Sequence, residues 1–229
     1  MKRKTTIITT LALLLSMLAA GCGSPGITIR GPRYAPASTV ARPPSIAQVS
    51  PGLYVAGIPS NEFEYFAAPR AQGRQRQSNW CWAACIQMTL NYHGLYVTQE
   101  QVVQRIFRAQ VDRPGNSSMI LAALSGWAPD TRGRFSTIHA SPYIMRGSTI
   151  VKDLANRWPL IVGLRGQPIG HAYVLTAVYY RVDPRNNEPI FQQVVLRDPW
   201  PSRTSRTTMS WTAFQRNLQF ISRVYVRRL

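Results

Sequence analysis

Cysteine, lysine and acidic residues are scarce in this chain of 229 residues. The cysteines are Cys22, Cys81 and Cys85, and the last two lie only four residues apart, so the sequence cannot build a disulfide framework. His, Cys and Asp residues do not occur at the spacing of metal ligands. We therefore expect neither a metal site nor any other cofactor.

The charge of the chain is one-sided. Lys and Arg number 27 against 9 Asp and Glu, a formal net charge of +18, and the lysines are only Lys2, Lys4 and Lys152. An arginine-rich surface favours anionic neighbours, such as the phospholipid head groups or lipopolysaccharide of a cell envelope. A solvated basic surface without a partner is the alternative. No nucleic-acid-binding motif accompanies the charge, so we expect no specific nucleic-acid partner.

Length and hydrophobicity together predict a globular protein. Hydrophobic residues make up 45% of the chain, which is enough for one domain with its own core. No internal repeat is visible. This composition excludes a disordered chain.

Residues 1–22 have the pattern of an export signal. A charged start, Lys2–Lys4, and an apolar run, Ile7–Leu18, precede Ala19–Cys22, and the run is too short to span a bilayer comfortably. The ending resembles a bacterial lipobox. That resemblance implies a lipid on Cys22, which becomes the mature N-terminus and anchors the protein to a membrane.

Two details of this ending bear on where the protein goes. Ala19 stands where a lipobox usually has leucine, so a plain signal peptide cleaved after an A-x-A-like site is the alternative. Gly23 follows the cysteine, which in a Gram-negative host would imply the outer membrane. We expect an exported protein that is lipid-anchored in the cell envelope, and the alternative ending implies a plain secreted one.

Residues 23–68 are rich in Pro, Gly, Ala and Ser and lack periodicity. This composition predicts an extended tether between lipid and domain, and a short inhibitory pro-segment is the alternative. Within it, Gly52–Ile58 is expected to form a first edge strand. The folded domain is expected to occupy residues 69–229.

Gln75–Cys85, with the sequence QRQSNWCWAAC, has the pattern of a helix start with a thiol in the first turn. Ser78 or Asn79 is expected to cap this helix and Gly94 to end it. Apolar residues recur every three or four positions and predict one buried stripe, formed by Cys81, Ala84, Cys85, Met88 and Tyr92. Cys81 then lies where the positive end of the helix dipole stabilises a thiolate, the reactive form of cysteine.

The remainder divides into a mainly helical first half and a β-rich second half. A capping box at Thr98 and Gln101 begins one of the helices. We expect helices over residues 98–109, 116–124, 148–157 and 211–218, and strands over residues 134–139, 160–164, 171–180, 190–196 and 220–226. This order predicts an α+β domain, with helices packed on an antiparallel sheet.

A hairpin in the second half is expected to bring two polar residues together. The turn cluster Asp183–Asn187 contains the midpoint between His171 and Asp198. A hairpin folded there places these two residues at neighbouring positions on paired strands. A carboxylate on one ring nitrogen of a histidine leaves the other nitrogen free to act on a thiol.

With these residues the chain resembles the papain-like cysteine peptidases. Cys81 followed by Trp82 and Ala83 at a helix start matches their nucleophile, His171 their general base, and Asp198 their third residue. The fuller string SNWCWAAC resembles the bacterial AvrRpt2-type branch, in which aspartate is the usual third residue. The resemblance implies hydrolysis of a protein or peptide through an acyl-enzyme, in a fold that packs the cysteine helix on an antiparallel sheet or half-barrel.

The resemblance also implies supporting roles. Gln75, six residues before Cys81, matches the oxyanion-hole glutamine, and Gln77 competes for that role. Trp82 matches the residue that follows the family's cysteine. Trp200 matches the tryptophan that shields the hydrogen bond of the third residue from water.

Two other functions stay open. Transglutaminase-like enzymes use Cys, His and Asp in the same order and transfer the acyl group to an amine, but their His-to-Asp interval is usually shorter than the one here. An inactive papain-like module, tethered to a membrane as an adaptor, is the non-enzymatic alternative. We expect Cys85 to be a buried core residue that stays separate from Cys81, and His93 to lie at a helix C-terminus. His139 has no evident partner in the sequence.

Overall fold

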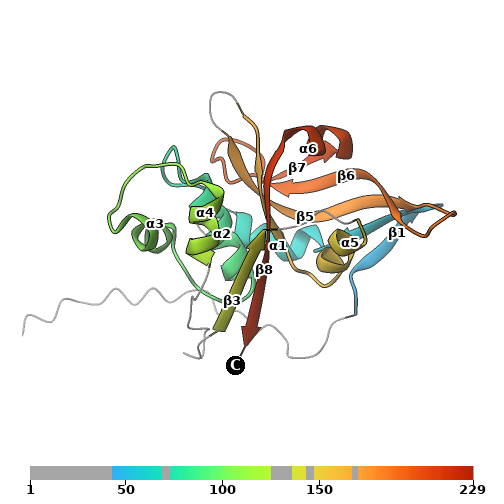
Figure 1. The fold of residues 1–229 in the computed structure, drawn as a ribbon, viewed down its shortest axis with the longest axis horizontal. Coiled ribbons are helices and arrows are strands. Elements are labelled where there is room, and N and C mark those ends of the chain that lie inside the picture. Colours follow the sequence, from blue (N-terminus) through green and yellow to red (C-terminus); the bar gives the residue numbers. More distant parts are fainter. Residues whose placement is uncertain (1–42, 69–72, 125–135, 143–146, 167–169, 229) are drawn as a thin grey trace, which may run out of the picture. The chain divides into compact units, whose positions relative to one another are not determined.

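The computed structural model describes residues 43–68, 73–124, 136–142, 147–166 and 170–228 (Figure 1). The expected export signal, Cys22 and the expected tether up to residue 42 lie outside these ranges.

The expected α+β class is confirmed, because helices and antiparallel strands share one folded unit. In chain order the elements are β1 (Ile46–Ser50), β2 (Leu53–Gly57), α1 (Ser60–Ala67), α2 (Cys81–Tyr92), α3 (Gln99–Phe107), α4 (Ser117–Leu124), β3 (Ser136–Pro142), α5 (Gly147–Ala155), β4 (Leu160–Leu164), β5 (His171–Val182), β6 (Pro189–Arg197), β7 (Arg206–Ser210), α6 (Trp211–Asn217) and β8 (Leu218–Arg228).

The strands form one eight-stranded sheet in the described part of the chain. The hydrogen-bonded order is β1-β2-β5-β4-β8-β3, with β6 beside β5 and β7 beside β6. β5 is the central strand (Figure 1). One of its edges pairs with β6, and the other is shared between β4, at His171–Leu175, and β2, at Ala177–Tyr180. Three neighbouring strands therefore position β5, which begins at His171.

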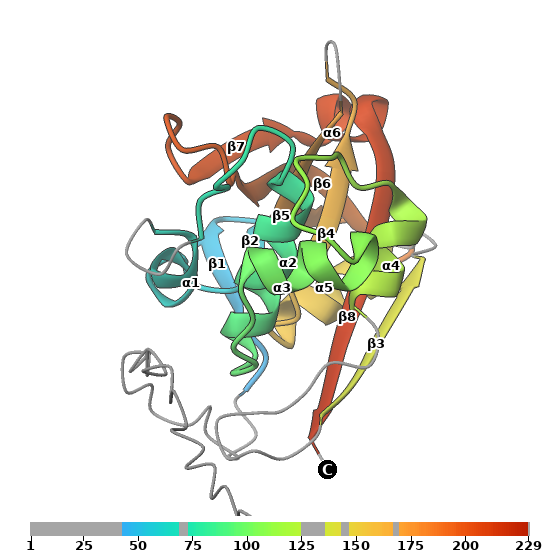
Figure 2. The same cartoon turned by 90° about the vertical axis from the view of Figure 1, so that its left-hand side faces the viewer.

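The two faces of the sheet bury separate apolar cores. Helices α2, α3 and α4 lie together in front of β4 and β5 in Figure 2, and α2 contributes Ile86 and Met88 to the core on that face. Helices α5 and α6 contribute Leu154 and Phe214 to the core on the other face. Successive residues of a strand point to opposite faces, so buried side chains of β4 are divided between the two cores.

Helix α2 begins at Cys81, as expected, but its cap differs from the expected one. Trp80 is the N-cap residue and no side chain caps the helix, so the expectation of Ser78 or Asn79 is wrong. Asn79 is instead engaged by Asp112, whose Oδ1 accepts from its backbone N–H at 2.8 Å. At the other end Gly94 adopts a φ of +83°, as the glycine after a helix does.

The folded unit extends further toward the N-terminus than the expected boundary at residue 69. β1 and β2 are strands of the sheet, and β2 lies between β1 and β5 instead of at the edge. The Pro and Gly residues that suggested a tether occupy turns and ends of elements: Pro51 and Gly52 form the β1–β2 turn, and Pro59 is the N-cap of α1. Residues 46–67 are therefore part of the domain.

A buried arginine ties α1 to β6. Arg197, the last residue of β6, is fully buried and donates to the Glu64 carboxylate and, at 3.2 Å, to the Ser60 carbonyl. Its guanidinium lies over the Phe63 ring, 5.8 Å from the centroid. Burial lowers the pKa of Arg197, and the charge of Glu64 opposes this effect only in part. Helix α1 thus supplies Glu64 as the anionic partner of Arg197, the residue that directly precedes Asp198.

The other local expectations are confirmed within a few residues. The Thr98–Gln101 capping box is present, with both of its hydrogen bonds. β4 has the expected bounds, and α5 ends at Ala155, two residues early. The β5–β6 turn lies at the expected Asp183–Asn187 cluster.

Candidate active site

Cys81 occupies a fixed helix start. Its side chain is partly buried, and the two tryptophans beside it hold this end of α2. The indole N–H of Trp80 donates to the Val111 carbonyl at 2.9 Å, and that of Trp82 donates to the Arg113 carbonyl at 3.1 Å. The thiol therefore lies in the first turn of α2, at the positive end of the helix dipole.

His171 and Asp198 are in contact, as the hairpin predicted. Nε2 of His171 lies 2.7 Å from Oδ1 of Asp198. The Cys81 thiol lies close enough to the imidazole to help raise the pKa of His171. The three residues are therefore neighbours in one site.

The register that produces this contact differs from the expected one by two residues. Arg197 pairs with Val174, so Asp198 comes level with Tyr173 and reaches His171 diagonally. The pairing also shifts twice, between Leu175 and Ala177 and between Tyr179 and Tyr180. Diagonal neighbours on adjacent strands remain within reach of long side chains, which is why the predicted contact forms without direct pairing.

Asp198 is held as a buried carboxylate. Its Oδ1 also accepts the backbone N–H of Trp200 at 2.9 Å, and Oδ2 lies 3.5 Å from Nη1 of Arg203. Burial raises the pKa of Asp198, but the hydrogen bonds from His171 and Trp200 and the charges of His171 and Arg203 outweigh it. The net effect is a pKa below the usual range, so Asp198 is ionised at neutral pH.

His171 is held as an imidazolium. Burial lowers the pKa of His171, but hydrogen bonds to Asp198 and Cys81, together with the charges of both, raise it to about 9. A protonated histidine at neutral pH carries the proton that a leaving amine needs.

Two aromatic rings confine the His171 ring. The Tyr173 ring meets it edge to face at a centroid distance of 4.7 Å, and the Trp200 ring at 6.1 Å. Trp200 therefore lies beside the His171–Asp198 bond, as the resemblance implied. Tyr173 was not among the predicted site residues. The alternation of β5 offered a signal for it, because Tyr173 lies two residues after His171 and on the same face of the strand.

The two candidate oxyanion glutamines differ in their surroundings. Gln75 is 5% exposed, and its Nε2 donates to the backbone carbonyls of Gln77 and Ser78 at 3.0 Å each. Its Oε1 is buried and accepts no hydrogen bond within the described part of the chain. Gln77 is exposed. The structure thus places Gln75 inside the loop that leads to Cys81.

The second thiol stays apart from the first, as expected. Cys81 and Cys85 are both free, and Cys85 is fully buried. Burial, with the charges of Cys81 and Asp198, raises the pKa of Cys85 well above its usual range. Cys85 is thus a core residue. His93 is the C-cap of α2, and His139 lies in β3.

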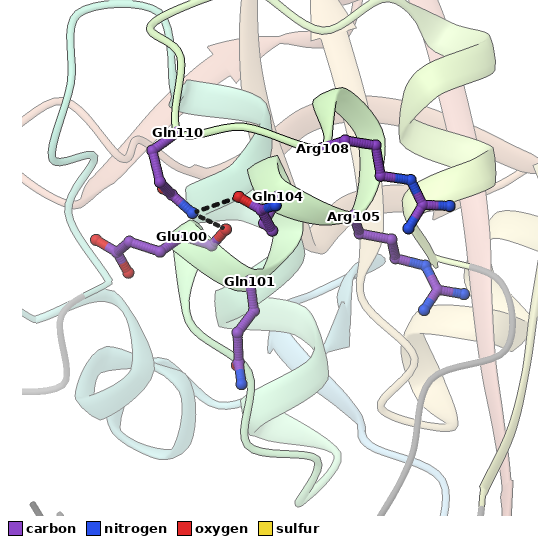
Figure 3. A pocket seen from close by; sticks show the side chains of 6 residues that line it. All are labelled: Glu100, Gln101, Gln104, Arg105, Arg108 and Gln110. Atoms are coloured by element: carbon purple, nitrogen blue, oxygen red, sulfur yellow. Dashed lines mark hydrogen bonds between the residues drawn. The ribbon is translucent and has the colours of Figure 1, made fainter. Parts of the chain in front are cut away.

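A separate polar pocket lies on the outer side of α3 (Figure 3). It has a volume of about 420 Å³ and is lined by Glu100, Gln101, Gln104, Arg105, Arg108 and Gln110. Gln110 Nε2 donates to the Glu100 carbonyl at 3.0 Å inside it. None of the predicted site residues lines this pocket.

The described ranges lack two features. No cluster of three or more His, Cys, Asp or Glu side chains there could hold a metal ion. No helix in those ranges is long and apolar enough to cross a membrane.

Fold and site together define a class. A thiol at the start of a helix faces a histidine and an aspartate from the antiparallel sheet on which that helix packs, which is the arrangement of papain-like cysteine peptidases. The sequence profile of the Peptidase_C39 like family matches residues 67–226. The chain belongs to this family and is a cysteine peptidase.

Solved structures to which this chain is similar include three peptidase domains. The peptidase domain of Streptococcus ComA, a bi-functional ABC transporter involved in a quorum-sensing pathway, shares 16% identity at a TM-score of 0.47, covering 68% of this chain and 96% of that one. A double-glycine motif protease from an AMS/PCAT transporter, in complex with the leader peptide, shares 16% identity at a TM-score of 0.42, covering 68% and 89%. The peptidase domain of Streptococcus mutans ComA shares 19% at 0.37, covering 67% and 95%. No curated protein matches this chain.

Proposed function

We propose that this chain hydrolyses peptide bonds in a protein or peptide through a triad of Cys81, His171 and Asp198. The observation that carries the proposal is the position of the imidazole. It is 2.7 Å from the Asp198 carboxylate, and it is close enough to the Cys81 thiol for that group to help raise its pKa. A base that is oriented by a third group and touches a nucleophile has the geometry of covalent acyl transfer.

The chemistry follows from these contacts. The Cys81 thiolate attacks the carbonyl carbon of the scissile peptide bond, and protonated His171 gives its Nδ1 proton to the leaving amine. Water then hydrolyses the acyl-enzyme, with neutral His171 as the general base. Asp198 orients the ring and stabilises its charged form in both steps.

The developing oxyanion needs N–H donors next to Cys81. We assign the backbone N–H of Cys81 and the side-chain amide of Gln75 to this role, with Gln77 as the alternative. Nε2 of Gln75 already donates to two carbonyls of its own loop. A substrate oxygen must therefore share or displace one of them.

The finer family assignment stays a prediction. The AvrRpt2-type branch rests on the string SNWCWAAC and on an aspartate at position 198.

The proposed activity is tested by labelling the thiol. The full-length chain and its Cys81→Ala variant are treated with an epoxide of the E-64 type and weighed by intact-mass spectrometry. We expect one adduct on wild type and none on the variant, because the epoxide requires a reactive thiolate in an open cleft. A folded wild-type protein without an adduct would favour the inactive, non-enzymatic module. Amine incorporation into glutamine substrates without cleavage would favour the transglutaminase-like alternative.

We further propose that the protein is exported and held in the cell envelope by a lipid on Cys22. The support is the order of charged, apolar and small residues before Cys22. The formal charge of +18 adds attraction to anionic head groups or lipopolysaccharide.

Lipid anchoring is tested by metabolic labelling with a fatty acid in a bacterial host. We expect wild type to carry the label and to stay with membranes in high salt, and Cys22→Ser to lose both properties. Cys81→Ser is the matched control and should keep them. An unlabelled wild-type protein in the soluble periplasmic fraction would favour a plain signal peptide.

A further inference from the structure

Gln99, the first residue of α3, is a buried amide with ordered partners on all sides. Its exposed fraction is 0%. Oε1 accepts the backbone N–H of Arg76 at 3.0 Å, while Nε2 donates to the Arg74 carbonyl at 2.8 Å and to Oε1 of Gln87 at 2.9 Å. These contacts join α3 and α2 to the segment Arg74–Arg76, which leads to Cys81.

The two backbone contacts lie on either side of Gln75 in the sequence. The Gln99 amide therefore binds the backbone on both sides of Gln75. The N–H of Gln75 itself donates to the Pro199 carbonyl at 2.8 Å. Gln75 is thus held between the Gln99 amide and the loop that follows Asp198.

Arg74 makes a second link between the segment Arg74–Arg76 and the loop that follows Asp198. Nη1 of Arg74 donates to the Asp198 carbonyl at 2.7 Å and to the Trp200 carbonyl at 3.2 Å. The segment is therefore fastened to the Asp198 loop on one side and, through Gln99 and Gln87, to the two helices on the other. The ion pair of Arg76 with Glu100 is about one-third exposed, so it adds little to the stability of this arrangement.

We propose that Gln99 is a positioning residue, which sets the place of the Gln75 amide relative to Cys81 and so forms the oxyanion hole. This inference rests on the proposed function. Gln99 acts through Arg74, Arg76 and Gln87, so its loss should spare the reactivity of the thiolate. It should weaken only reactions that place negative charge on a carbonyl oxygen.

The test compares two reactions of the same thiol in the full-length chain. Acylation by p-nitrophenyl acetate forms an oxyanion, whereas alkylation by iodoacetamide does not. Both rates are measured at Cys81, with Cys81→Ala subtracted as background. We expect Gln99→Leu to lower the acylation rate about 10- to 100-fold and to change the alkylation rate less than about twofold. Gln104→Leu, at an exposed position of the same helix, is the matched control and should change neither rate.

A second variant covers the case in which Gln99→Leu does not fold. Gln99→Glu keeps the size of the side chain and the acceptor for Arg76, but its carboxylate cannot donate to Arg74. We expect a low ratio of acylation to alkylation at neutral pH and recovery of the ratio in acid, because a protonated carboxyl donates again. A side chain that only fills space would show no such recovery.

The outcomes separate the two proposals. Acylation that is equally fast in wild type, Gln99→Leu and Gln99→Glu would overturn the role of Gln99 and leave the peptidase intact. Equal losses of acylation and alkylation would also overturn it, because the thiolate itself would then depend on Gln99. Wild type that reacts no faster than Cys81→Ala in both reactions would overturn the proposed function, and the role of Gln99 with it.

Discussion

A chain that begins at residue 69 is expected not to fold, whereas one that begins at residue 43 is expected to fold and to keep its activity. The shorter chain matches the domain that the sequence predicts, but it lacks β1, β2 and α1. Deletion of residues 43–68 removes the fully buried Ala56, Phe63 and Ala67. It also leaves Arg197 buried without the Glu64 carboxylate.

The free energy lost through this deletion is large compared with the stability of a domain. Removal of a buried phenylalanine side chain alone costs about 3–5 kcal/mol. Removal of one partner from a buried ion pair costs up to about 3–5 kcal/mol, and less here because the Glu64 side chain is 51% exposed. The sum approaches the whole stability of a typical domain, about 5–15 kcal/mol. Circular dichroism and thermal unfolding of the two chains provide the measurement.

Point variants on α1 give a milder form of the same test. Glu64→Gln should lower the melting temperature, and Glu62→Gln is the matched control on the same helix. Glu62 lies 3.5 Å from Arg157, which is not as deeply buried as Arg197, so its replacement should have the smaller effect. A cooperatively folded, active 69–229 chain would show instead that the N-terminal elements are dispensable.

Replacing His171 by glutamine is expected to lower kcat/KM for peptide hydrolysis by about 10⁴-fold or more, because the proton donor and the base are lost together. Asp198→Asn should cost less. Its amide oxygen can still accept from Nε2 of His171 and from the Trp200 N–H, whereas its charge is gone. An Asp198→Asn variant as inactive as His171→Gln would show that the charge, and not orientation, is what the third residue supplies.

The pH dependence of hydrolysis tests the pairing of His171 with Asp198. Hydrolysis should fall as the pH rises through about 9, where His171 loses its proton. Asp198 raises the pKa of His171, so in Asp198→Asn the fall should move to lower pH. Pre-steady-state acylation rates between pH 6 and about 10 would measure it, and an unmoved alkaline limb would contradict the pairing.

The same groups link pH to stability. The pKa of His171 is above its unfolded value of 6.5, so its contribution is complete below that pH and is lost as the pH rises through about 9. The pKa of Asp198 is below its unfolded value of 3.8, so its contribution is present above that pH and is lost as the pH falls through the lowered value.

Much of the site could be predicted from the sequence because its determinants are local. The start of α2 at Cys81, the Thr98 capping box and the bounds of β4 follow from residues a few positions apart. The His171–Asp198 contact spans a longer interval, yet one turn cluster determines it. An error of two residues in the register left the contact possible, since diagonal neighbours also meet.

The elements that were missed depend on distant partners. Residues 46–67 were expected as a tether with one edge strand, which is β2, so β1 and α1 were missed; the stretch folds because β2 pairs with β5 and Glu64 of α1 pairs with Arg197. Trp80 is the N-cap of α2 and makes no side-chain bond, and the preceding Asn79 donates its backbone N–H and its side-chain amide to Asp112 instead. The amino-acid composition of a short stretch of sequence carries no information on contacts with distant residues.

The sequence by itself determined the α+β class, because periodicity and turns encode it within short stretches. It also predicted Cys81, His171 and Asp198 as the triad, from the helix start, the hairpin and the resemblance to papain-like peptidases. Only the tertiary structure decided which strands flank β5, which helix neutralises Arg197 and which amide holds Gln75. Those choices depend on burial, since a buried polar group must find a partner wherever the fold brings one. Such partners lie up to 141 residues apart in this chain.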